Sequence, residues 1–165
     1  MKGDKTAGSK EQVPECSGKR IAVVAARFYR ELADDLIAGA LQALRDCKVS
    51  DTDIFQYEVP GCFELPLACR KLIDTERFDA LVALGVVIRG DTPHFDFVAG
   101  ECARGIMDVS LAAGIPIGFG VLTTENMSQA RERSDPKHGN KGYGAAIAAA
   151  SLISFPGDIP RAGFR

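Results

Sequence analysis

Two nearly uninterrupted apolar runs constrain the fold of this chain more than any other feature. They cover residues 21–28 (IAVVAARF) and residues 80–88 (ALVALGVVI). Strands that are apolar along their whole length, and not only at alternate positions, are typical of parallel sheets covered on both faces. Both runs therefore predict strands buried inside such a sheet.

Helical spacing follows the first of these runs. Leu32, Leu36, Ala40 and Leu44 are separated by four-residue steps, which predicts an amphipathic helix from residue 30 to about residue 47. The same reasoning predicts further strands over residues 53–59 and 117–122, and helices over residues 64–75, 92–113, 126–133 and 143–155. Alternating strands and helices imply right-handed crossovers between parallel strands. We therefore expect a three-layer α/β/α sandwich with a four-stranded parallel sheet of flavodoxin-like topology, and leave open an extra N-terminal strand.

The sequence predicts one domain between two tails. Residues 1–18 are rich in Gly, Ser, Lys and Glu, which predicts a disordered or docking N-terminal tail. Residues 19–155 carry the strand and helix patterns without an internal repeat or linker. Residues 156–165 contain two prolines and two glycines and form the predicted C-terminal tail.

Charge and composition exclude several classes of protein. Lys and Arg number 20 against 22 Asp and Glu, so there is no general positive field for nucleic acid or an anionic membrane. The apolar run at residues 80–88 is too short to span a membrane. The polar first residues lack the apolar core of a signal peptide. Five cysteines without C-x-x-C spacing predict free thiols and no zinc site. We expect a cytoplasmic protein.

Unusual residues follow each of the four predicted strands. These segments are residues 27–29 (RFY), 59–64 (VPGCFE), 89–94 (RGDTPH) and 122–125 (LTTE). Ligands of parallel sheets bind outside the carboxyl ends of the strands, so these segments predict the site. Dinucleotide-binding and P-loop glycine motifs are absent from the sequence, as is a serine nucleophile elbow, which argues against those functions.

The segment from Gly90 to His94 has the clearest chemical meaning. A helix that begins near Thr92 would present free N–H groups and a positive dipole end to a phosphate. The same dipole disfavours imidazolium, so His94 is a candidate neutral base. A proline-capped helix with an ordinary exposed histidine is the alternative.

Three other features allow a functional and a structural interpretation. Phe28 could stack on a planar heterocycle or belong to the core. Glu64 could accept hydrogen bonds from sugar-like hydroxyls or complement a helix dipole. Arg133, Lys137 and Lys141 suit a phosphate or a solvated loop.

Taken together, the strand-end segments resemble a known family. IAVVAARF, VPGCFELP, GVVIRGDTPHFDFV, GVLTTENMSQA and RERSDPKHGNKG are similar, in order and spacing, to the signature segments of 6,7-dimethyl-8-ribityllumazine synthases. The resemblance extends from about residue 20 to residue 154. It implies a transferase that condenses 5-amino-6-(D-ribitylamino)uracil with 3,4-dihydroxy-2-butanone 4-phosphate, giving the lumazine, phosphate and water. This is the penultimate step of riboflavin biosynthesis, and the family needs no metal or other cofactor.

The resemblance also implies a role for individual residues. His94 would transfer protons, and Phe28 would stack on the pyrimidine. The remaining substrate-binding residues would be Gly61, Cys62, Glu64, Val87 and Ile88 around the ribityl-pyrimidine, Asp91, Thr92, Arg133 and Lys141 around the phosphate, and Phe119 from a neighbouring subunit. The sequence departs from the family at Tyr29, where Asn is common, and at Gly144, where an acidic residue is frequent.

Assembly follows from the same resemblance. Family members form pentamers with active sites between adjacent subunits, and some pentamers assemble into icosahedral shells. The short segment between Arg133 and Lys141 favours the shell. Two other functions stay open: a non-catalytic lumazine- or flavin-binding or shell-forming paralogue, and the related archaeal-type riboflavin synthase.

Overall fold

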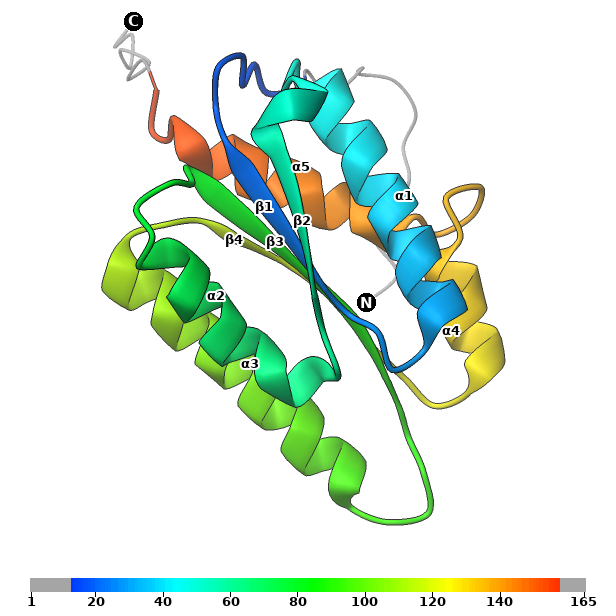
Figure 1. Ribbon diagram of the computed structural model, residues 1–165. Helices are drawn as coiled ribbons and strands as arrows, with labels where there is room; N and C mark the ends of the chain where they lie inside the picture. Colours follow the sequence, from blue (N-terminus) through cyan, green and yellow to red (C-terminus); the bar gives the residue numbers. More distant parts are fainter. Residues whose placement is uncertain (1–12, 158–165) are drawn as a thin grey trace, which may run out of the picture.

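A computed structural model describes residues 13–157 of the chain. Its centre is a sheet of four parallel strands, drawn in Figure 1. The strands are β1 (Ile21–Ala26), β2 (Ile54–Val59), β3 (Ala80–Ile88) and β4 (Ile117–Thr124), in the order β2-β1-β3-β4. This confirms the predicted parallel sheet of flavodoxin-like type.

Helices cover both faces of the sheet, as a three-layer sandwich requires (Figure 1). One face carries α1 (Arg30–Asp46), α4 (Met127–Ser134) and α5 (Lys141–Ile153). The other carries α2 (Leu65–Ile73) and α3 (His94–Ala113). Two short 3₁₀ turns, η1 (Asp51–Asp53) and η2 (Cys62–Glu64), stand before β2 and after it.

The continuous apolar pattern of β1 has a direct cause in these two layers. Ile21, Val23 and Ala25 pack into the core beneath α1 and α5. Ala22 and Val24 pack into the core beneath α2 and α3. Because successive side chains of a strand point to opposite faces, a strand covered on both sides needs apolar residues throughout.

The start of α3 differs from its predicted position by one residue. The sequence predicts Thr92 as the N-cap and Pro93 as the first helical residue, whereas Pro93 is the N-cap and the helix begins at His94. The Asp96 N–H donates to the Pro93 carbonyl at 3.0 Å, a three-residue closure that delays regular helical bonding. Thr92 still serves this end of the helix, because its Oγ1 accepts from the His94 N–H at 3.4 Å.

The described part of the N-terminal segment is attached to the domain. Cys16 is buried, and its N–H donates to the Cys47 carbonyl at 2.8 Å. Residues 13–20 contain no strand, so the extra N-terminal strand is absent from this part. The rest of the predicted tails, residues 1–12 and 158–165, lies outside the described residues. Among residues 13–157, no helix combines the length and the apolarity needed to cross a membrane.

Candidate active site

A pocket of about 550 Å³ lies where the chain connections diverge. The chain leaves β1 towards β2 at one edge of the sheet, and leaves β3 towards β4 at the other. Such a divergence opens a crevice at the carboxyl ends of the central strands, which is the usual ligand site of this architecture. The lining residues are Phe28, Tyr29, Gly61, Cys62, Phe63, Glu64, Val86, Val87, Ile88, His94, Phe97 and Val98.

The unequal lengths of β1 and β3 give the pocket one wall. The pairing of β1 with β3 ends at Ala25 and Leu84, while β3 continues beside β4 as far as Ile88. The last residues of β3, Val86 to Ile88, therefore extend past β1 and line the pocket. Gly85 stands just before them, and a Cβ atom there would lie 2.5 Å from the Cys62 Sγ. A glycine at this position makes room for the Cys62 side chain.

Three exposed aromatic rings surround the opening. Phe28, Phe63 and Phe97 are 75%, 62% and 67% exposed, although each lines the pocket. Large apolar side chains that gather at an exposed crevice mark a binding site. Phe28 also packs edge-to-face with Tyr29, at 5.0 Å between ring centroids. The pocket therefore offers flat apolar surfaces to a planar ligand.

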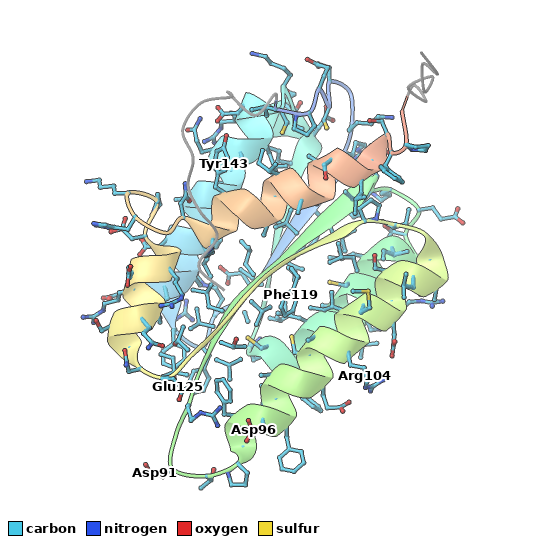
Figure 2. The ribbon with its side chains drawn as sticks, turned by 180° about the vertical axis from the view of Figure 1, so that it is seen from behind. Asp91, Asp96, Arg104, Phe119, Glu125 and Tyr143 are labelled. Atoms are coloured by element: carbon cyan, nitrogen blue, oxygen red, sulfur yellow. The ribbon has the colours of Figure 1, made fainter. Side chains whose placement is uncertain are left out.

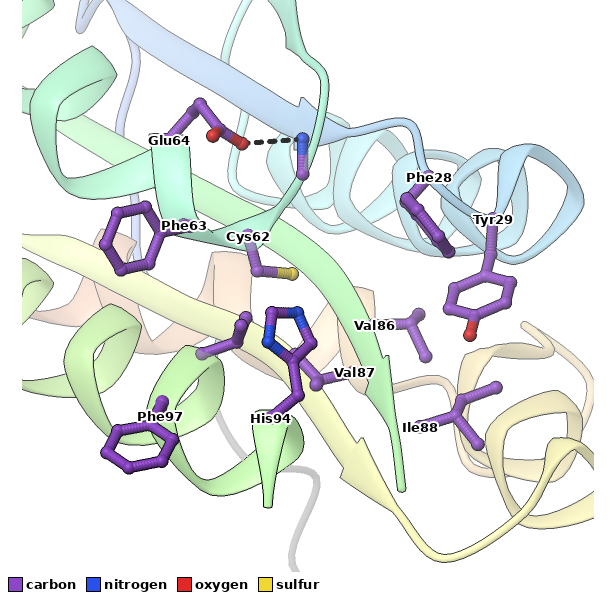
Figure 3. Close-up of a pocket in the computed structure, with 12 residues that line it drawn as sticks. Phe28, Tyr29, Cys62, Phe63, Glu64, Val86, Val87, Ile88, His94 and Phe97 are labelled. Atoms are coloured by element: carbon purple, nitrogen blue, oxygen red, sulfur yellow. Dashed lines mark hydrogen bonds between the residues drawn. The ribbon is translucent and has the colours of Figure 1, made fainter. Parts of the chain in front are cut away.

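Glu64 supplies the carboxylate of the pocket. One of its oxygens, Oε2, accepts from the Gly61 N–H at 3.0 Å, a bond drawn in Figure 3. This contact closes the turn after β2 and fixes the carboxylate at the start of α2. The other oxygen is available to accept hydrogen bonds from a ligand.

His94 enters the pocket from the side opposite Phe28. Its imidazole projects from the first residue of α3, and Figure 3 shows the ring beside Cys62 and Val87. The side chain is exposed, so a ring nitrogen can exchange a proton with a ligand or with water.

Cys62 contributes volume to the pocket and no reactive thiolate. The side chain is buried, and burial raises the pKa of its thiol to about 12. The thiol is therefore neutral near pH 7, and neutral thiols are poor nucleophiles.

Five of the predicted substrate-binding residues do not line this pocket. Asp91 and Thr92 are exposed on the loop that leads to His94, and Figure 2 shows Asp91 beyond the end of α3. Phe119 lies midway along the edge strand β4 and is 46% exposed. Arg133 donates to the Gln129 carbonyl at 3.2 Å within α4, and Lys141 is exposed at the start of α5.

Comparison with known proteins identifies the family of this chain. The family model for 6,7-dimethyl-8-ribityllumazine synthase matches residues 18–156. The chain belongs to this family. It is 47% identical over 137 residues to a 6,7-dimethyl-8-ribityllumazine synthase of Desulfatibacillum aliphaticivorans, an alignment that covers 83% of this chain and 88% of that protein.

Family membership decides several predictions made from the sequence. It confirms that the chain is a lumazine synthase-type transferase of riboflavin biosynthesis. The comparisons give no support to a non-catalytic paralogue. Of the predicted site residues, Phe28, Gly61, Cys62, Glu64, Val87, Ile88 and His94 share the pocket in this lumazine synthase fold.

Other lining residues had no assigned role in the sequence analysis. Phe63 and Phe97 stand next to residues with clear chemical meaning, but a phenylalanine carries no motif of its own. Val86 belongs to the apolar run of residues 80–88, which predicts a buried strand and gives no sign of a binding role. Helical spacing could have identified Phe97 as a pocket residue. It lies three residues after His94 and therefore on a neighbouring part of the same helix face.

The described residues hold no cluster of three or more His, Cys, Asp or Glu side chains able to bind a metal ion. The ionisable groups that line the pocket are Tyr29, Cys62, Glu64 and His94. Substrate binding and proton transfer are therefore the chemistry that this pocket offers from its own side chains.

Proposed function

We propose that this protein condenses 5-amino-6-(D-ribitylamino)uracil with 3,4-dihydroxy-2-butanone 4-phosphate in the pocket between Phe28, Glu64 and His94. The observation that carries the proposal is the combination of an exposed aromatic ring, a fixed carboxylate and an exposed imidazole around one cavity. A flat heterocycle with a polyol chain needs the first two groups, and a condensation needs the third.

The ribityl-pyrimidine binds in the part of the pocket built by β1, β2 and β3. Phe28 stacks on the pyrimidine ring, and the free oxygen of Glu64 accepts from ribityl hydroxyls. The Gly61 and Cys62 backbone and the side chains of Val87 and Ile88 line the same space. These contacts hold the nucleophilic amine in reacting geometry.

The phosphate of the second substrate binds near the loop before α3. Asp91 and Thr92 are exposed there, next to the N-terminal end of a helix with a positive dipole. Arg133 and Lys141 supply positive charge from a neighbouring subunit, since neither lines the pocket of its own chain. Phe119 reaches the pocket in the same way.

The reaction needs few chemical groups. The amine attacks the ketone, a Schiff base forms with loss of water, phosphate leaves by elimination, and the ring closes with loss of a second water. His94 moves protons between these steps. Much of the rate enhancement then comes from holding two substrates together in reacting geometry.

Assembly and location belong to the same proposal. The functional unit is a pentamer with sites between adjacent subunits, and the short segment between Arg133 and Lys141 favours an icosahedral shell of such pentamers. A cytoplasmic location fits five buried free cysteines, because a reducing compartment keeps thiols unpaired.

One assay tests the function against its alternatives. Purified protein is incubated with both substrates, and lumazine absorbance and phosphate release are followed. Equal amounts of both products support the proposal. Binding of the pyrimidine without turnover would point to a paralogue, and riboflavin formed from lumazine alone would point to the archaeal-type riboflavin synthase. Sedimentation or electron microscopy distinguishes a pentamer from a shell.

A further inference from the structure

Arg89, the residue after β3, joins three elements at the edge of the pocket. Its Nε donates to Glu125 Oε2 at 2.9 Å, just beyond the end of β4. Its Nη1 lies 3.3 Å from Asp96 Oδ1 in the first turn of α3. The guanidinium carbon is 4.3 Å from the centre of the Phe95 ring. Figure 2 shows Asp96 and Glu125 close together at this end of the molecule.

The loop that Arg89 spans has few other supports. Residues 90–93 are all exposed, and a Cβ atom on Gly90 would meet nothing within 4 Å. The Arg89 N–H donates to the Thr124 carbonyl at 2.9 Å, which anchors the start of the loop to β4. At the far end of the loop, Phe95 and Asp96 are the two residues that follow His94. The Arg89 side chain touches both of them.

The charge of this cluster argues against a direct role in binding phosphate. One guanidinium faces two carboxylates, so the group of Arg89, Asp96 and Glu125 has a net negative charge near neutral pH. An anion gains little from a guanidinium already paired in this way. Arg89 also does not line the pocket.

We propose that Arg89 is a positioning residue that fixes the first turn of α3 against the ends of β3 and β4, and thereby places His94 in the pocket. This inference rests on the proposed function for its catalytic consequence. A planar guanidinium suits the task because separate N–H groups hold the two carboxylates while its face packs on the Phe95 ring, all in one fixed geometry. Small displacements of a catalytic group are costly to turnover, whereas exposed ion pairs contribute little to stability.

The first test is the variant Arg89→Met, which keeps an unbranched apolar stem and removes the charged guanidinium. We expect kcat to fall roughly tenfold. The KM for the pyrimidine should stay within about twofold, because Phe28 and Glu64 lie on other elements. Arg89→Lys should recover part of the loss, since lysine keeps the charge without the fork. Loss of pyrimidine affinity with unchanged kcat would overturn the proposal.

Arg104 provides a matched control on the same helix. It also bridges two carboxylates, at 2.6 Å to Glu101 and 2.7 Å to Asp108, and Figure 2 shows it farther along α3. Arg104→Met also removes two ion pairs, but both lie within α3 and away from His94. We expect its kcat to remain within about twofold of the parent value. An equal loss in both variants would mean that Arg89 supports the helix in general and not His94.

A double-mutant cycle shows whether Arg89 acts through His94. In a His94→Ala background, Arg89→Met should cost less than about twofold, because the group it positions is gone. The full tenfold loss in that background would contradict the proposal. If Arg89→Met does not fold, Glu125→Ala leaves the guanidinium in place, removes one of its anchors, and enters the same cycle.

Hydrogen exchange tests the positioning without turnover. Amides of residues 97–100 close their helical bonds on the first turn of α3. Their exchange should be faster in Arg89→Met than in the parent protein, and the exchange rates in Arg104→Met should equal those of the parent. Identical protection in Arg89→Met and the parent would refute the positioning. An inactive parent protein with this exchange pattern would instead refute the proposed function alone.

Discussion

His94 is the side chain whose removal separates proton transfer from substrate positioning. We expect His94→Ala to lower kcat by about 10²-fold or more while turnover persists, because Phe28 and Glu64 still hold the pyrimidine. Steady-state kinetics with both substrates measure this. His138, which contacts Asp135 at 2.8 Å outside the pocket, is the matched control, and His138→Ala should keep kcat within about twofold. Unchanged turnover in His94→Ala would remove the histidine from the mechanism.

Gly85 and Cys62 form a size-matched pair beneath the pocket. A Cβ atom on residue 85 would lie 2.5 Å from the Cys62 Sγ and 3.2 Å from the Ala26 Cβ. We expect Gly85→Ala to lower the free energy of unfolding by about 1–3 kcal/mol through this overpacking. The added change Cys62→Ala removes the sulfur and should recover most of the loss. Denaturant unfolding of the two single variants and the double variant measures the coupling, and simple additivity would contradict it.

At the scale of elements, one exposed hydrogen bond joins α5 to the end of α1. The Tyr143 hydroxyl donates to Asp46 Oδ2 at 2.8 Å. This bond, with a second from Gln42, lowers the pKa of the Asp46 carboxyl. We expect Tyr143→Phe to reduce the free energy of unfolding at pH 7 by about 0.5–1 kcal/mol.

The pH dependence of the stability lost in Tyr143→Phe follows from the direction of the Asp46 pKa shift, which is downward. A carboxyl whose pKa is depressed by folding stabilises the protein above its unfolded pKa, near 4, and loses this contribution as the pH falls through the lower folded value. The difference in the free energy of unfolding between the parent and Tyr143→Phe should therefore have its full value above about pH 5 and shrink towards pH 2. Tyr57→Phe, on β2, should show no such trend. A difference that persists at acid pH would exclude the Asp46 bond as its cause.

The sequence predicted elements well where burial alone sets the pattern. Ile21 to Ala26 are apolar because both faces of β1 are covered, so the pattern identifies the strand directly. The predicted start of α3 was wrong by one residue because the local closure at Pro93 has no periodic signal. The role of Arg89 was missed because its partners, Asp96 and Glu125, are seven and 36 residues away in the chain. Contacts between loops depend on tertiary structure, which no local spacing encodes.

At the scale of the whole molecule, a single chain leaves apolar side chains on its surface. Large exposed residues of α2 and α3 include Leu67, Phe97, Met107 and Leu111, and Phe119 is exposed on β4. Together with the basic residues that lie outside the pocket, these side chains fit a ring in which each subunit covers its neighbour. Such a ring would complete each pocket with Phe119 and Arg133 of the next subunit.

Mixed rings of two defective variants test this arrangement. Glu64→Ala damages the pocket formed by the residues of its own chain. Arg133→Ala damages the part of the site that a chain would contribute to the neighbouring subunit. If sites lie between subunits, a randomly mixed ring contains about one quarter of sites that are intact on both sides. Co-expression in equal amounts should therefore restore about a quarter of parent activity, measured at low concentration of the phosphorylated substrate. Glu64→Ala mixed with Phe28→Ala should restore none, because both changes damage the same side. Activity no greater than the sum of the single variants in the first mixture would place each complete site within one chain.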